Sequence, residues 1–105
     1  MTDNLIVFVT CVNSTQAESI AKAVVEEKLA ACVNVLPGVR SWFVWKEKLT
    51  SSEEVLLLIK TTMGRFGQLR DRVRALHSYE VPEIIGIGIE DGLPEYLNWI
   101  ERSVE

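Results

Sequence analysis

The chain has 105 residues, about the length of one domain, which excludes an enzyme built around a cleft between two domains. Its residues are 48% hydrophobic and 25% charged, a balance typical of a folded globular protein. Fifteen acidic and eleven basic side chains give a formal net charge of −4, which argues against a general nucleic-acid binder because phosphate contacts need clustered Lys and Arg. We expect a single domain over residues 1–105 with no nucleic-acid partner.

The apolar runs of the sequence are short. The longest are Leu5–Val9 and Val55–Ile59, far below the ~20 residues that cross a bilayer, and no cationic segment precedes a signal-type stretch. We therefore expect no membrane partner and a cytoplasmic localisation. Without a secretion signal, Cys11 and Cys32 are interpreted as free thiols, and their separation lacks zinc-ligand spacing.

The first predicted element is a strand over Leu5–Cys11, an almost unbroken β-branched and apolar run that indicates cover on both faces. A helix follows up to about Lys28, with Ala17, Ile20 and Val24 at helical spacing. Its start is predicted at a capping box in which the Thr15 hydroxyl and the Glu18 carboxylate satisfy free backbone amides.

A long hairpin comes next. Ala31–Leu36 and Val39–Trp45 are interpreted as one strand interrupted by a bulge or bend at Pro37-Gly38, and Glu53–Thr61 returns as its partner. A second helix carries apolar residues from Phe66 to Leu76 and ends near His77.

The last two elements are a strand over Pro82–Glu90 and a helix that opens at Pro94 and continues to about Val104. The resulting order is strand, helix, strand, strand, helix, strand, helix. It predicts an α+β, ferredoxin-like βαββαβ fold with an antiparallel sheet, its first and third strands in the middle, helices on one face and an added C-terminal helix. A different pairing of the same strands stays open.

Three of these strands are apolar at successive positions, so both sheet faces need cover, yet the helices of this topology cover only one. The hairpin strengthens the point, because the sixteen residues from Ala31 to Lys46 would extend roughly 50 Å and a globule of this length is roughly 34 Å across. Near its tip lie Trp42, Phe43 and Trp45, whose burial would remove roughly 450 to 750 Å² from water. We expect this arm to dock on a neighbouring copy in a closed oligomer; the alternative is an arm folded back on its own sheet.

Potential metal ligands gather at one end of the predicted sheet. These are Cys11, His77, Glu80 and Glu83, with Tyr79 beside them. Thiolate together with imidazole favours copper or zinc over magnesium or calcium. Two structural alternatives stay open: His77 as a hydrogen-bonded helix end, and Cys11 as a small buried apolar side chain.

Signs of catalysis are weak. No serine lies in a nucleophile elbow, and no motif supplies a nucleophile with its base, so we predict that the protein is not an enzyme. The remaining enzymatic alternative uses His77 as a general base oriented by Glu83. The arginines of the second helix, with Asp71 among them, are interpreted as a solvated face rather than an anion site.

Several segments together resemble the CutA divalent-cation tolerance proteins, in order and over nearly the whole chain. They are Glu27–Asn34, Pro37-Gly38, Trp45, Lys60–Thr62, His77–Ile85 and Tyr96–Ile100. The resemblance implies a ferredoxin-like subunit in a tight homotrimer, similar to the PII signalling proteins, whose long hairpins contact neighbouring subunits.

The same resemblance implies a link to tolerance of copper and other divalent cations. Copper ligands in bacterial members are ascribed to a first-strand cysteine and two adjacent histidines. Val9 stands at the cysteine's position, with Cys11 two residues later, and Leu76 and His77 stand where the histidine pair would be. His77 alone carries over. The leading hypothesis is a copper-binding homotrimer with His77, Glu83, Glu80 and Cys11 near the metal; the alternative is a PII-like module that binds a metabolite or a partner protein in clefts between subunits.

Overall fold

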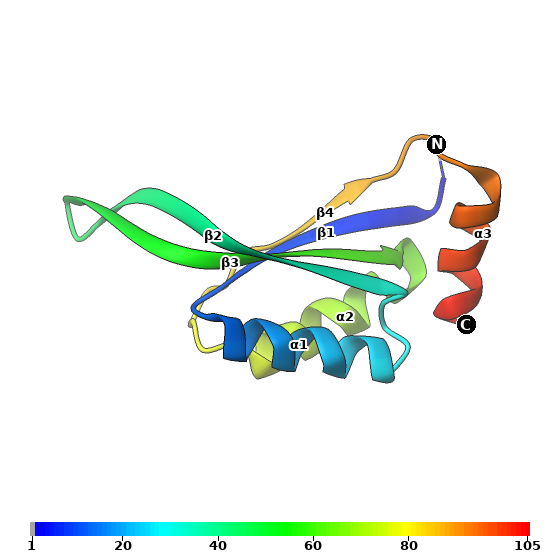
Figure 1. Cartoon of the computed structure of the whole chain (residues 1–105), viewed down its shortest axis with the longest axis horizontal. Coiled ribbons are helices and arrows are strands. Elements are labelled where there is room, and N and C mark those ends of the chain that lie inside the picture. Colours follow the sequence, from blue (N-terminus) through cyan, green and yellow to red (C-terminus); the bar gives the residue numbers. More distant parts are fainter. Residues whose placement is uncertain (1) are drawn as a thin grey trace.

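The computed structural model describes residues 2–105, which form a four-stranded antiparallel sheet and three helices (Figure 1). The elements, in chain order, are β1 (Asn4–Cys11), α1 (Ser14–Glu26), β2 (Cys32–Trp45), β3 (Lys48–Thr62), α2 (Met63–Leu76), β4 (Ile84–Gly88) and α3 (Pro94–Ser103). The strand order is β2-β3-β1-β4, so the prediction that the first and third strands occupy the middle is confirmed.

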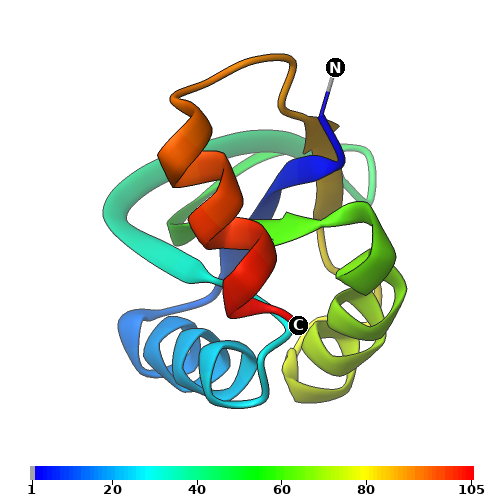
Figure 2. The same ribbon diagram turned by 90° about the vertical axis from the view of Figure 1, so that its right-hand side faces the viewer.

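The helices divide between one face and one end of the sheet. Figure 1 shows α1 and α2 side by side beneath the sheet, and Figure 2 shows α3 crossing the end at which β1 begins. The core lies between the sheet and α1 and α2, where Val7, Val9, Leu57 and Ile59 of the strands are fully buried. None of the helices within residues 2–105 has the length and apolar character needed to span a bilayer.

The predicted capping box is wrong by two residues. Asn13 is the N-cap of α1, and its side-chain oxygen accepts a 2.9 Å hydrogen bond from the Gln16 backbone N–H. Gln16 Oε1 accepts a 3.2 Å hydrogen bond from the Val12 N–H, one residue before the N-cap, whereas a capping box would use the N–H of the N-cap itself. Asn is at least as good an N-cap as Thr, so the helix begins at the earlier cap and gains residues.

The predicted irregularity at Pro37-Gly38 is confirmed. The pairing of β2 with β3 shifts register between Leu36 and Val39. Gly38 adopts a φ of +79°, a left-handed conformation that side chains disfavour. The bulge bends the hairpin where it leaves the sheet.

Beyond this bulge the β2–β3 hairpin extends away from the rest of the molecule as an arm, which gives overall dimensions of 45 × 25 × 22 Å (Figure 1). The alternative in which the arm folds back on its own sheet is therefore wrong. Trp42 and Trp45 are 64% and 61% exposed, and Phe43 is 40% exposed. One chain thus leaves its aromatic arm open to water.

The sheet face opposite α1 and α2 is apolar and only partly covered. Phe8 of β1 pairs with Leu58 on one side and Ile85 on the other, and Ile6 pairs with Ile87. Ile85 and Ile87 are each 52% exposed. Large apolar side chains in cross-strand register make a continuous surface that favours association with another protein surface.

Candidate functional site

The candidate site lies where β1 ends and the hairpin arm leaves the sheet. Cys11, the last residue of β1, pairs with Val55 of β3, and Glu54 precedes Val55. The segment after α2 brings His77 and Tyr79 to the same place. We call these four residues, Cys11, Glu54, His77 and Tyr79, the β1-end cluster.

His77 is the C-cap of α2 and is 8% exposed, so the predicted helix end is confirmed. Its Nδ1 accepts a 3.1 Å hydrogen bond from the Tyr79 backbone N–H. An accepting Nδ1 carries no proton, so Nε2 carries it and donates to the Thr10 carbonyl, 2.7 Å away. Both ring nitrogens are therefore engaged within one chain, and a metal would have to displace one of these bonds.

Tyr79 reaches across to the hairpin and covers Glu54. Its hydroxyl donates a 2.9 Å hydrogen bond to Glu54 Oε2, and its ring lies 4.7 Å from the His77 ring, centre to centre. Burial, then this hydrogen bond and the charge of Glu54, raise the pKa of Tyr79 to about 12. The phenol is therefore a proton donor throughout the physiological range.

Glu54 is an acidic side chain that is only 7% exposed. The ion pairs within residues 2–105 join Arg70 to Asp71 and Arg72 to Glu27, so no cationic side chain neutralises Glu54 there. A buried carboxylate normally has a cationic or metal partner, because removing it from water is costly. The cluster thus carries uncompensated negative charge.

Cys11 is fully buried, which agrees with its interpretation as a small core side chain. Burial first, and the negative charge of Glu54 second, raise the pKa of the Cys11 thiol to about 11. The sulfur is thus a thiol at neutral pH, and a soft metal would have to displace its proton.

The structure does not place the predicted ligands in one shell. Glu80 and Glu83 are exposed, and across residues 2–105 no three His, Cys, Asp or Glu side chains are close enough to hold a metal ion. One chain therefore offers separate potential donors and an incomplete coordination sphere.

Glu54 is the member of the cluster that sequence reasoning missed. It stands immediately before the apolar run Val55–Ile59, a position that usually faces solvent at a strand end. Glu53 beside it occupies an equivalent place and is exposed, so the sequence carried no signal for the burial of Glu54.

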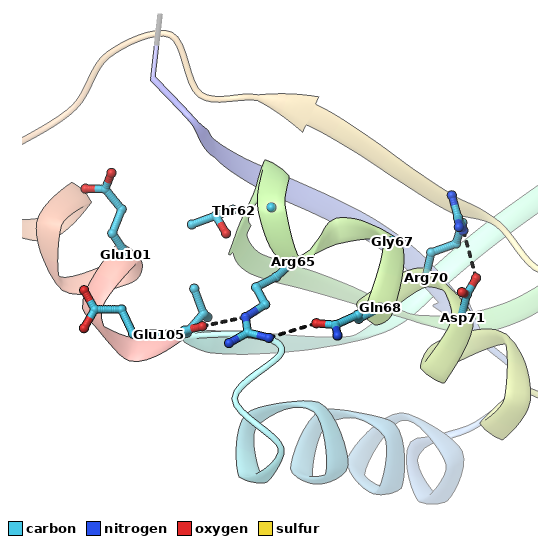
Figure 3. A pocket seen from close by; sticks show the side chains of 10 residues that line it. Thr62, Arg65, Gly67, Gln68, Arg70, Asp71, Glu101 and Glu105 are labelled. Atoms are coloured by element: carbon cyan, nitrogen blue, oxygen red, sulfur yellow. Dashed lines mark hydrogen bonds and ion pairs between the residues drawn. The ribbon is translucent and has the colours of Figure 1, made fainter.

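A second feature lies apart from this cluster. A surface cavity of about 780 Å³ separates the start of α2 from the end of α3 (Figure 3). Arg65 on its wall donates from Nε to the Val104 carbonyl at 2.6 Å and from Nη1 to Gln68 Oε1 at 2.9 Å. Arg70 pairs with Asp71, so these cations are already engaged, as expected for a solvated face.

Comparisons with known proteins agree on one family. The profile described as CutA1 divalent ion tolerance protein matches residues 5–103. The chain is 46% identical to the divalent-cation tolerance protein CutA of Thermus thermophilus over 98 residues, 93% of this chain and 95% of that protein. It is also 46% identical to human protein CutA over 98 residues, which are 93% of this chain and 55% of the human protein.

Solved structures give the same result. The crystal structure of CutA from Xylella fastidiosa superposes with a TM-score of 0.97 at 40% identity, and the match covers 99% of this chain and 100% of that one. The periplasmic divalent cation tolerance protein CutA of Archaeoglobus fulgidus gives a TM-score of 0.94 at 42% identity, covering 97% and 99%.

The strand order, the two helices on one face and the overhanging β2–β3 arm define a ferredoxin-like α+β protein with an extended hairpin and a C-terminal helix. Together with the profile match and the identities above, they establish that the chain belongs to the CutA1 divalent ion tolerance family.

Proposed function

We propose that the chain is a non-enzymatic homotrimer that binds divalent cations, copper most strongly, at the β1-end cluster and thereby contributes to metal tolerance. The observation that carries this proposal is Glu54, a 7% exposed carboxylate without a cationic partner in the described part of the chain, within the cluster that holds Cys11 and His77. A divalent cation would neutralise that charge.

Copper suits the donor types of this cluster. Thiol and imidazole donors favour copper or zinc over magnesium and calcium, and copper(II) binds more strongly than zinc in most such sites. In this proposal His77 is the principal ligand, Cys11 and Glu54 assist, and the exposed Glu80 and Glu83 approach from the following loop. Adjacent subunits supply the donors that one chain lacks.

The proposed trimer is supported by the apolar surfaces that one chain leaves exposed to solvent. The exposed aromatics Trp42, Phe43 and Trp45 would dock on a neighbouring copy, whose partly covered apolar sheet face presents Ile85 and Ile87. Burying both surfaces removes apolar area from water and protects an exposed hairpin from uncontrolled association. Three copies related by a rotation close this contact without leaving one arm unpaired.

Isothermal titration with Cu²⁺ tests the proposal on the purified protein. The wild type should bind with saturation, and His77→Ala and Glu54→Gln should each weaken binding about tenfold or more, which corresponds to about 1.4 kcal/mol. Glu18→Gln, which removes an exposed negative charge from α1 away from the cluster, is the control and should bind normally. Equal affinity in the wild type, His77→Ala and Glu54→Gln would remove the site.

A second candidate function follows from the loop between α2 and β4. Val81 in that loop is 84% exposed, so its side chain is free to contact a bound molecule. This supports a PII-like regulatory role in which a small metabolite or partner protein binds beside Tyr79–Glu83. A compound that raises the melting temperature in the presence of a chelator would favour this role over metal binding.

The free thiols support a reducing compartment, and we propose the cytoplasm. Relatives carry the labels chloroplastic, in Arabidopsis thaliana, and periplasmic, in Archaeoglobus fulgidus. Fractionation of the native cells with immunodetection of the chain decides the location.

A further inference from the structure

Tyr79 contacts two of the proposed metal ligands at once, through two different groups. Its backbone N–H donates to His77 Nδ1 at 3.1 Å, and its hydroxyl donates to Glu54 Oε2 at 2.9 Å. Its ring also lies 4.7 Å from the His77 ring, centre to centre. One residue therefore occupies a lone pair on each of these two ligands.

The two ring nitrogens of His77 differ in how readily a metal could reach them. Nε2 carries the proton and donates to the Thr10 carbonyl at 2.7 Å, and Thr10 is held in the sheet by its pairing with Leu56. Nδ1 already has a free-electron pair directed at a hydrogen-bond donor, and that donor belongs to residues 77–83, a segment without helix or strand. Because such a segment opens at a lower cost than a sheet, Nδ1 is the nitrogen that a metal can gain.

The Tyr79 backbone occupies the place that a metal on Nδ1 would need. A metal bound to an imidazole nitrogen stands about 2.0 to 2.1 Å from it. With the Tyr79 nitrogen 3.1 Å from Nδ1 on its lone-pair side, a metal there would be left only about 1 Å from that nitrogen. Tyr79 must therefore move away before Nδ1 can act as a ligand.

The same movement exposes Glu54. The hydroxyl and the N–H belong to one residue, and an O–H···O bond extends only to about 3.0 Å, so the 2.9 Å bond to Glu54 has little room to stretch. Once it breaks, the 7% exposed carboxylate has an unoccupied oxygen, and no ion pair within residues 2–105 neutralises it. Displacement of Tyr79 thus makes a nitrogen and an oxygen ligand available together.

We propose that Tyr79 is a lid on the metal site, closed over His77 and Glu54 in the metal-free chain and released when a divalent cation binds His77 Nδ1 and Glu54. This inference rests on the proposed metal function and adds its regulation. Since the cation binds only the open form, the closed lid lowers its apparent affinity. The loop that follows, with the exposed Val81, moves with Tyr79, so the chain presents a different surface with and without metal.

Isothermal titration with Cu²⁺ on the full chain tests the lid through the sign of a change in affinity. Tyr79→Phe removes the hydroxyl bond to Glu54 and keeps the backbone N–H, so it populates the open form and should tighten binding at least about threefold. If Tyr79 were a ligand, or if it oriented Glu54 toward the metal, the same variant would bind more weakly. Tyr96→Phe, which removes the other tyrosine hydroxyl of the chain, from α3, is the matched control and should bind as the wild type does. Unchanged or weaker binding by Tyr79→Phe would overturn the inference.

Nuclear magnetic resonance of the wild type with Zn²⁺ gives a second test that needs no variant. His77 is the one histidine of the sequence, so its ring nitrogen signals are unambiguous. Saturating Zn²⁺ should shift the Nδ1 signal, leave the proton on Nε2, and remove the protection of the Tyr79 amide from hydrogen exchange.

The two tests separate failure of the lid from failure of the metal site. Zinc bound through Nε2, or a Tyr79 amide that stays protected with zinc bound, would overturn the lid and leave metal binding at His77 in place. Binding of Cu²⁺ and Zn²⁺ that does not depend on His77 would remove the proposed metal site, and the lid with it.

Discussion

The Tyr79 hydroxyl donates a 2.9 Å hydrogen bond to the Glu54 carboxylate and so joins the loop after α2 to the base of the hairpin arm. Because Glu54 is 7% exposed, this bond satisfies a carboxylate that water reaches poorly. The same carboxylate raises the pKa of both Tyr79 and Cys11. Glu54 therefore connects the loop after α2 to the hairpin arm and also affects the pKa of the Cys11 thiol.

Removing the hydroxyl with Tyr79→Phe leaves Glu54 without its donor. The expected loss in the free energy of unfolding is about 1 to 3 kcal/mol, the usual cost of an unsatisfied buried acceptor. Urea denaturation at pH 7 measures it. Glu54→Gln keeps an acceptor for the hydroxyl and should cost less. A larger loss in Glu54→Gln than in Tyr79→Phe would contradict this account of the bond.

The stability of the protein should fall as the pH rises from 9 to 11. The pKa of Cys11 is about 11 in the folded chain against 9.0 ordinarily, so above pH 9 the unfolded chain releases a proton that the folded chain retains. The stabilisation is complete below pH 9 and is lost through pH 11, at most about 2 to 3 kcal/mol from this group. Tyr79, with its pKa of about 12, extends the decline to higher pH.

Denaturation series at several pH values check this expectation in the wild type and in Cys11→Ala. The variant loses core contacts at every pH, so the slope with pH is the informative quantity, and it should be shallower between pH 9 and 11 in the variant. Identical slopes would mean that Cys11 does not titrate as its burial requires.

The exposed sheet face should control assembly. Ile87→Lys places a charge among apolar side chains. Self-association through this face would bury that charge without a partner, so the assembly should dissociate at micromolar concentration. Light scattering coupled to size-exclusion chromatography measures the mass. Val25→Lys, at a 41% exposed position on α1, is the matched control and should leave the mass unchanged. A wild-type monomer would refute the proposed trimer directly.

Substitution by alanine at two glycines should change the free energy of unfolding in opposite directions. Gly38 has a φ of +79° and no atom near a new Cβ, so Gly38→Ala should cost about 1 to 2 kcal/mol from backbone conformation alone. At Gly67, inside α2, the closest neighbour of a new Cβ is the end of the Arg70 side chain at 3.8 Å, so Gly67→Ala should stabilise by about 0.5 to 1 kcal/mol. Denaturant midpoints compare the two, and a stabilising Gly38→Ala would contradict the left-handed assignment.

Much of the fold was predictable because the spacing of apolar residues along the chain indicates which side chains are buried and which are exposed to solvent. The run Leu5–Cys11, the helical spacing of Ile20 and Val24, and the interruption at Pro37-Gly38 all correspond to observed elements. The start of α1 was misplaced because two overlapping capping pairs fit the sequence, and only the structure distinguishes Asn13–Gln16 from Thr15–Glu18.

The candidate site was predictable only in part. His77 and Cys11 were identified by residue type and by their place at strand and helix ends, and their role toward a metal stays a prediction. Glu54 could not be recognised, since nothing in its local pattern distinguishes a buried carboxylate from the solvated one beside it, Glu53.

Local patterns along the chain were enough to predict the order of the elements, the long arm and the excess of apolar sheet surface, because each depends on neighbours a few positions apart. The pairing of polar atoms could be read only from the packed chain: Tyr79 bonds Glu54 across 25 positions, and Asn4 bonds Leu97 across 93. Such contacts depend on strand register and helix placement, which are properties of the whole packed chain.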